Sequence, residues 1–347
     1  MNNMRIFKYF SIIILFFIFS LWFLGVFSSY QEFSGKIYNT YYKVKIRSKK
    51  TNSDLSQQIK QTLDDINSKM SVFIKDSELN NINQSKQDVD IKLSDDLSHV
   101  LKTSAQINFQ SRGYFDPAIS PLIDAWGFGR NKKTAISNDN KIKELLSYSK
   151  FSKLKFSDDY SKVSKSDERT ELNLSAIAKG YAVDKIAELL EKNGHHDYIV
   201  DIGGEVKASG YRDNKKNPWN IGVSAPLKNN NSNAFVLSLT NIAVATSGDY
   251  RNFITAENGE TFSHTISPLT GYPVIDKLAS VTVLHSSCMK ADAYATAIMA
   301  MGHEQGLKFA QEHNLPIIMF VHQSRGDFEI KISDAAKSLI GVEHEAN

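Results

Sequence analysis

Residues 245–253 and 262–273 hold the densest group of side chains that could do chemistry. This short part of the chain combines several hydroxyls with the carboxyl group of Asp249, the guanidinium of Arg251 and the imidazole of His264. An arginine can bind a phosphate through two parallel hydrogen bonds, and a histidine changes protonation near neutral pH. The combination could therefore handle a phosphoester, with His264 moving a proton. The glycines and prolines at these spacings are also typical of ordinary turns, so the pattern leaves a structural role open.

Two predicted helices carry groups that suit a cation and a phosphate. In the helix predicted over residues 290–301, Asp292 and Thr296 are four positions apart and share one face. A carboxylate and a hydroxyl suit a hard cation such as Mg²⁺, although an acid near a helix start also complements the helix dipole. The helix predicted to open at Ser175 has free backbone N–H groups and Lys179 nearby, which could receive a pyrophosphate. An ordinary surface helix with Ser175 as its N-cap explains the same residues.

The elements that must position these groups follow from hydrophobic periodicity and turn signals. Residues 35–47 predict a strand or hairpin, and Gly203-Gly204 a tight turn between two strands. Residues 131–169 are polar and predict a peripheral insertion with a short helix near 142–146. Helices are predicted at 54–69, 95–109, 175–192, 290–301 and 303–313, and strands at 198–202, 205–209, 278–285 and 316–321. Because helices and strands alternate irregularly, the pattern favours a mixed α/β (α+β) fold over a purely parallel sheet.

Composition narrows the class of protein. The chain has 347 residues, of which 41% are hydrophobic and 23% charged, as in a globular protein with a substantial core. Its single cysteine excludes an internal disulfide and a cysteine-rich metal centre, so any metal must bind to oxygen or imidazole. The formal net charge is +3, and Arg5 and Lys8 supply two of these charges, so the rest of the chain is nearly neutral. This balance gives no electrostatic reason to expect nucleic-acid binding.

The N-terminus predicts export. After Arg5 and Lys8, residues 9–27 carry no charge and are long enough for a membrane-spanning helix or the apolar part of a signal peptide. We therefore expect residues 1–30 to be a signal peptide or membrane anchor and residues 31–347 to be one exported domain, since basic residues before an apolar segment stay in the cytoplasm. A buried core helix is the alternative interpretation. No cysteine lies directly after the apolar segment, where a lipid anchor would be attached, so the protein is not expected to be a lipoprotein.

A series of short segments, taken together and in order, resembles the ApbE family of FAD:protein FMN transferases. The resemblance runs from about residue 35 to residue 321. Each segment alone is weak, and their order makes the resemblance specific. The segments are Met70-Ser71-Val72-Phe73, Ser77-Glu78-Leu79 to Asn83, Gly113-Tyr114-Phe115-Asp116-Pro117, Trp126-Gly127-Phe128-Gly129, residues 174–184, Ile202-Gly203-Gly204-Glu205, residues 245–250, residues 264–273, and Ala291-Asp292-Ala293 to Thr296-Ala297.

The resemblance implies an α/β body with an FAD-binding cleft and a Mg²⁺-dependent transfer of FMN from FAD to a threonine or serine of an acceptor protein, with release of AMP. It implies that Asp292, Thr296 and the carbonyl of Ala176 bind Mg²⁺, with Ala295 close by. It places His264 in catalysis, and Arg251 or Lys179 would add positive charge. The positions that would contact FAD are Tyr38, Phe73, Tyr114, Phe115, Asp116, Asn173, Lys179 and Ile266.

The family pattern also implies an acceptor and a cellular location, and it leaves other functions open. The expected acceptors are flavoprotein subunits of respiratory redox complexes, and the expected location is the periplasmic face of the bacterial inner membrane. The chain departs from the family at Tyr38-Asn39-Thr40, where Met-Gly-Thr is usual, at Asn173, where Asp is common, and at Ala118, where Thr is common. These departures predict altered flavin contacts. A Mg²⁺-dependent FAD pyrophosphatase that uses water, or a non-enzymatic exported flavin carrier, are the competing hypotheses.

Overall fold

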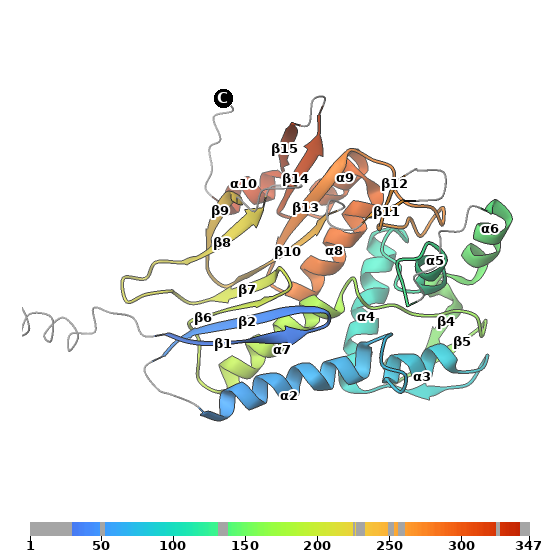
Figure 1. Cartoon of the computed structure of the whole chain (residues 1–347), viewed down its shortest axis with the longest axis horizontal. Helices are drawn as coiled ribbons and strands as arrows, with labels where there is room; N and C mark the ends of the chain where they lie inside the picture. The colour runs from blue at the N-terminus through green and yellow to red at the C-terminus, as the bar shows by residue number, and fades with distance from the viewer. Residues whose placement is uncertain are drawn as a thin grey trace, which may run out of the picture.

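An eight-stranded antiparallel sheet forms the centre of the structure (Figure 1). The structure is a computed structural model that describes residues 30–48, 53–130, 138–224, 226, 233–248, 253–255, 261–323 and 327–340. The strands follow the order β1 (Tyr30–Ile37), β2 (Thr40–Arg47), β6 (Tyr198–Ile202), β7 (Glu205–Ser209), β10 (Ile242–Gly248), β13 (Leu278–His285), β14 (Ile317–His322) and β15 (Phe328–Ile332). Each neighbouring pair is antiparallel, so the mixed fold has no parallel central sheet.

The remaining elements surround this sheet. The helices are α2 (Ser53–Met70), α3 (Glu78–Gln84), α4 (Asp95–Gln110), α5 (Ser120–Ala125), α6 (Asp139–Tyr148), η1 (Phe151–Lys153), α7 (Ala178–Lys192), α8 (Cys288–Met301), α9 (His303–Glu312) and α10 (Asp334–Ile340). The smaller sheets contain β3 (Ile91–Lys92), β5 (Lys162–Lys165) and β4 (Leu154–Phe156), then β8 (Trp219–Ser224) with β9 (Asn233–Leu239), and β11 (Phe253–Thr255) with β12 (Thr261–Ser263).

The two faces of the sheet are buried in separate cores. Strand β10 shows the alternation, because Ala243 and Ala245 join the core beneath α7 and α8, whereas Val244 joins the core on the other face. The first core also includes the apolar side chains of α2 and α4. The β8–β9 pair and α10 cover the second, with Trp219 and Phe320 among its large side chains. Because successive side chains of a strand point to opposite faces, this one sheet contributes to a packed core on each side.

The helices α7 and α8 touch at a glycine. A Cβ atom on Gly180 would lie 2.3 Å from the carbonyl oxygen of Cys288 and 2.8 Å from the Cα of Met289. Such distances are shorter than any real contact, so the close approach of the two helices requires glycine at this position. This approach brings the first turn of α7 beside α8, where it helps to form the site described below.

Most predicted elements are confirmed, with some corrections. The 35–47 segment belongs to the β1–β2 hairpin, and β13 covers the predicted 278–285. The insertion contains α6 as predicted, but also β4 and β5 of a small sheet. Ser175 is not the N-cap of α7: the helix begins at Ala178 after Ile177, which makes no side-chain cap. The polar and turn-forming residues at 245–248 left an ordinary turn open as an interpretation. These residues instead belong to strand β10, because their backbone pairs with β13.

The N-terminal prediction falls outside the described residues. Residues 1–29 are not among them, so the signal or anchor and the proposed boundary near residue 30 stay predictions. Within the ranges that the structure describes, no helix is both long enough and apolar enough to cross a membrane.

Candidate active site

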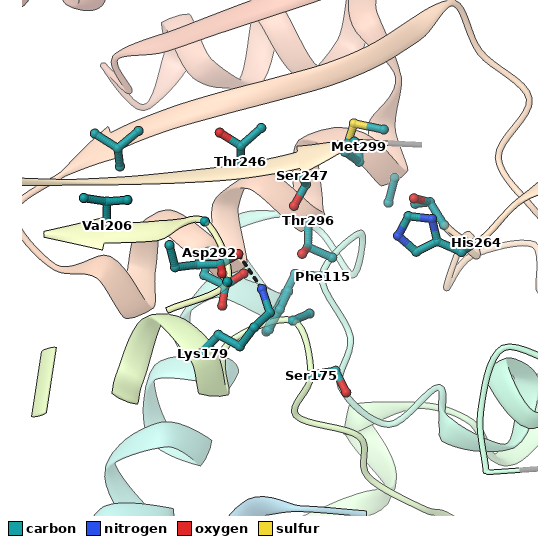
Figure 2. Close-up of a pocket in the computed structure, with 18 of the residues that line it drawn as sticks. Phe115, Ser175, Lys179, Val206, Thr246, Ser247, His264, Asp292, Thr296 and Met299 are labelled. Atoms are coloured by element: carbon teal, nitrogen blue, oxygen red, sulfur yellow. Dashed lines mark hydrogen bonds and ion pairs between the residues drawn. The ribbon is translucent and has the colours of Figure 1, made fainter. Parts of the chain in front are cut away.

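A cavity of about 670 Å³ opens where β6, β7, β8 and β10 meet α8 and the loops before α5 and α7. Figure 2 shows Lys179, Asp292 and Thr296 close together, with His264 on the other side of Thr296 in this view. Residues from segments far apart in sequence therefore share one space. Its volume is within the usual range for sites that hold a cofactor-sized molecule. The candidate residues that line it are Tyr114, Phe115, Asp116, Asn173, Ala176, Lys179, His264, Ile266, Asp292 and Thr296.

A cluster of three charged side chains lies at the inner end of this cavity. The ammonium of Lys179, in the first turn of α7, forms an ion pair and hydrogen bond with Oε1 of Glu205, the first residue of β7. Asp292 in α8 accepts a hydrogen bond from the backbone N–H of Gly180, at 3.0 Å. Glu205 and Asp292 are each only 3% exposed. Two buried carboxyl groups thus face one ammonium, and the cluster carries a net negative charge when both of them are ionised.

The protonation of this cluster reflects burial and mutual charge. Burial, together with the nearby charge of Asp292, raises the pKa of Glu205 to about 7, although the charge of Lys179 opposes this shift. Burial also raises the pKa of Asp292, while Lys179 and the Gly180 N–H lower it. Burial alone would lower the pKa of Lys179, but the charges of Asp292 and Glu205 outweigh it and keep the lysine protonated. The cluster therefore favours an additional positive charge.

The donor set around Asp292 fits a hard cation. Asp292 and Thr296 are one turn apart on α8, and both line the cavity together with Ala176. Oxygen donors of this kind are the ligands that Mg²⁺ prefers. Oε2 of Glu205 is buried and has no hydrogen-bond partner among the described residues, which agrees with a missing positive or hydrogen-bonding group. In the described ranges, no group of three or more His, Cys, Asp or Glu side chains is placed to hold a metal ion, so at Asp292 hydroxyl and backbone oxygens would complete the ligand set.

The loop before α5 presents Tyr114, Phe115 and Asp116 to the cavity. Asp116 fixes this loop, because its Oδ1 accepts the N–H of Ala118 at 2.8 Å and its Oδ2 accepts the N–H of Phe151 at 2.9 Å. Burial raises the pKa of Asp116 to about 6, although both N–H groups lower it. The aromatic side chains and this anchored carboxyl form a wall suited to a flat ring with polar edges.

The loop before α7 forms the next wall. The backbone N–H of Asn173 donates to the carbonyl of Pro117 at 2.7 Å, which ties this loop to the previous one. Oδ1 of Asn173 accepts hydrogen bonds from the N–H of Ser175, at 2.9 Å, and from its hydroxyl, at 2.6 Å. Ser175 therefore acts in the loop rather than as a helix cap. Asn173 uses its carbonyl oxygen to hold the cavity wall, a role that aspartate could also fill.

Comparison with known proteins decides the family. The model of the ApbE family matches residues 38–319. The chain belongs to the ApbE family. A protein of Haemophilus influenzae named FAD:protein FMN transferase is 35% identical over 88% of this chain and 90% of its own length. A protein of the same name from Vibrio cholerae is 34% identical over 78% of this chain and 80% of its own length.

Solved structures agree with this membership. The flavin transferase ApbE from Vibrio cholerae superimposes with a TM-score of 0.82 at 30% identity, covering 90% of this chain and 99% of that one. The apo form of the flavinyl transferase ApbE from Pseudomonas stutzeri gives the same TM-score at 28% identity, covering 91% and 98%. The mixed α/β fold expected from the sequence is therefore confirmed as the ApbE fold.

Four of the expected ApbE-family site residues do not line the cavity or cannot be placed. Tyr38 lies in the β1–β2 turn, and its hydroxyl donates to the carbonyl of Leu63 in α2 at 3.0 Å. Phe73 is 64% exposed in the loop after α2, and Ala295 is fully buried in the core face of α8. Neither lines the cavity. Arg251 lies outside the described residues. The structure thus does not bring Tyr38, Phe73 or Ala295 to the cavity.

Sequence reasoning gave no role to Glu205, Tyr41 or Asp201, which also line the cavity of this ApbE-family chain. Glu205 stood in the segment Ile202-Gly203-Gly204-Glu205, but its carboxylate follows a turn that resembles any hairpin. The sequence signal that could have identified Glu205 is an acid placed directly after two glycines that follow a buried strand. In the structure, these two glycines have positive φ angles of 63° and 103°. Tyr41 and Asp201 carry no such signal.

Proposed function

We propose that this chain transfers FMN from FAD to a serine or threonine hydroxyl of an acceptor protein, as a FAD:protein FMN transferase. The observation that carries the proposal is the joint presence, in one cofactor-sized cavity, of the Lys179–Glu205–Asp292 cluster and His264. With a divalent cation bound, the cluster would suit the phosphate end of a dinucleotide, and a histidine suits the activation of a hydroxyl. Membership of the ApbE family and the names of the most similar relatives support the same reaction.

The residues of this chain have separable tasks in that reaction. A ring nitrogen of His264 takes the proton of the acceptor hydroxyl while the hydroxyl oxygen forms a bond to the FMN phosphorus. The bond between that phosphorus and the oxygen bridging to AMP breaks, and AMP leaves with the electron pair. The ammonium of Lys179 faces the negative charge that this step redistributes. Glu205 holds the ammonium in place through its ion pair.

We infer a Mg²⁺ site at the same end of the cavity. Asp292, Thr296 and the carbonyl of Ala176 would hold the ion, whereas Ala295, which precedes Thr296 on α8, is buried in the core and does not line the cavity. When bound, Mg²⁺ supplies positive charge that neutralises phosphate oxygens. The two buried carboxyl groups beside a single ammonium support this assignment.

The setting is part of the proposal. The charge pattern of residues 1–30 supports a signal peptide or anchor that places the body on the periplasmic face of a bacterial inner membrane. Acceptors there would be flavoprotein subunits of respiratory redox complexes. Their serine or threonine must enter the cavity near His264.

One incubation tests the proposed reaction. The purified chain is mixed with FAD, Mg²⁺ and membrane proteins from the cells that encode it, and the products are resolved by mass spectrometry and chromatography. The proposal predicts AMP together with flavin that stays on a protein after denaturation. Free FMN with AMP would instead indicate a pyrophosphatase, and unchanged FAD would indicate a carrier; either result overturns the proposal.

A further inference from the structure

Strand β8 leaves one edge unpaired within the part of the chain that the structure describes. β8 pairs with β9 on one side, from Trp219 opposite Leu239 to Ser224 opposite Asn233. Among the described residues no third strand joins this sheet, and no backbone group of β8 bonds to a turn or loop. The N–H and C=O groups of the second edge can therefore pair with another extended chain.

This edge borders the active-site cavity. Asn220, Gly222 and Ser224 line the cavity, and so does Ile221, whose side chain belongs to the core below the strand. Successive side chains of a strand point to opposite faces. Because neighbours of both orientations line the same space, the backbone of β8 itself borders the cavity. Asn220 and Gly222 are also exposed, so a second chain can approach them.

The edge of β8 lacks the features that usually prevent strand pairing. Charged side chains and proline commonly protect free edges in natural proteins. The outer strand β1 carries Glu32 and Lys36, and the outer strand β15 carries Glu329 and Lys331. The sequence of β8, Trp-Asn-Ile-Gly-Val-Ser, has no charge and no proline. On the other side of the pair, α10 packs beside β9. The unprotected edge is thus the one beside the cavity.

We propose that the acceptor protein binds as an added β-strand along the free edge of β8, with its serine or threonine side chain directed into the cavity. This inference rests on the proposed function and adds how the partner is recognised. Strand addition gives affinity through backbone hydrogen bonds and specificity through alternate side chains. The small residues Gly222 and Ser224 leave room for the acceptor backbone. The acceptor must therefore present its hydroxyl on an extended segment rather than on a helix.

A peptide assay tests this binding mode with the wild-type, full-length chain. A library of short random peptides with one central threonine is incubated with the chain, FAD and Mg²⁺, and fluorescent peptides are selected. Each backbone N–H of one selected peptide is then replaced in turn by N–CH₃. Because alternate N–H groups of an added strand face the pairing edge, we expect transfer to fall about tenfold or more at every second position and to change little between them.

A matched pair of enzyme variants locates the binding edge. Gly222→Val adds a branched side chain where β8 lines the cavity, and Ser238→Val adds the same side chain on the exposed face of β9, outside the cavity. We expect the KM for the peptide to rise about tenfold in the first variant and to stay unchanged in the second. Hydrogen exchange of β8, with β1 as the internal reference edge, should slow only when the peptide is present.

The outcomes separate this inference from the proposed function. Flavin on proteins of the membrane extract but on no peptide would mean that the acceptor is recognised as a folded surface, and would overturn strand addition alone. An N–CH₃ series without a two-residue period, or equal effects of Gly222→Val and Ser238→Val, would overturn it as well. Absence of flavin from both peptides and proteins would overturn the transferase function itself.

Discussion

Lys179→Met is predicted to destabilise the folded chain strongly when no divalent cation is present. Methionine keeps most of the side-chain length but removes the ammonium that Glu205 and Asp292 share. Breaking a buried ion pair by removing one partner typically costs about 3–5 kcal/mol. Because the side chain of Lys179 is 31% exposed whereas that of Glu205 is 4% exposed, we expect the lower end, about 3 kcal/mol.

The loss should depend on pH. Without Lys179, the pKa values of Glu205 and Asp292 rise further above the carboxyl pKa values of the unfolded chain, which are about 4. The folded variant then binds protons that the unfolded chain releases, so its stability relative to wild type falls as pH increases from about 5 to 8. Added Mg²⁺ should recover part of the stability, because a cation bound only by the folded state stabilises it.

Urea unfolding of four chains measures this effect: wild type, Lys179→Met, Glu205→Gln and the double variant. We expect the double variant to be less destabilised than the sum of the single variants, by about 1–3 kcal/mol. Lys185→Met is the matched control, because Lys185 lies on the same helix and pairs with Asp96 and Glu188, whose side chains are 19% and 52% exposed, rather than with a fully buried carboxyl group. That change should cost about 1 kcal/mol or less. Additive effects, or a Lys179→Met loss no larger than the control, would refute the account of the cluster.

Three further results are expected. In Asp116→Asn, the free energy of unfolding relative to wild type should improve by about 2 kcal/mol between pH 4 and pH 7, because a carboxyl pKa raised to about 6 makes the wild-type contribution fall as pH rises through this range; a constant difference in urea unfolding would contradict it. His264→Ala should bind FAD almost normally in fluorescence quenching yet transfer FMN about tenfold more slowly or worse in single turnover; parallel losses would indicate a structural histidine. A reporter active only outside the cytoplasm, fused after residue 347, should be active, and deletion of residues 9–27 should abolish its signal.

The sequence predicted those elements whose signals are local. The apolar positions of α2 recur at helical spacing, and β13 is rich in apolar and β-branched residues, so both were predicted near their observed bounds. The sheet order could not be predicted in this way, because β2 pairs with β6 through residues as distant as Tyr42 and Ile202. Local spacing does not encode such pairings.

The predictions of the site residues divide in the same way between local signals and contacts made only by the fold. Asp292 and Thr296 were found because four-residue spacing on a helix is a local signal. The predicted start of α7 was wrong because Ser175 hydrogen-bonds to Asn173 in the preceding loop instead of capping the helix. Glu205 received no role because its partner, Lys179, is 26 residues away and meets it only through the fold. Sequence thus identifies groups within one element more readily than clusters assembled from several.

The ratio of AMP to protein-bound FMN in a single turnover tests the central claim most directly. Wild-type chain loaded with FAD is mixed with Mg²⁺ and an excess of a peptide or protein acceptor, and both products are quantified as they form. We predict that AMP and bound FMN appear at the same rate in a ratio near one, and that Asp292→Ala suppresses both. AMP release that exceeds bound FMN, with free FMN making up the difference, would show that water rather than an acceptor hydroxyl attacks the phosphorus.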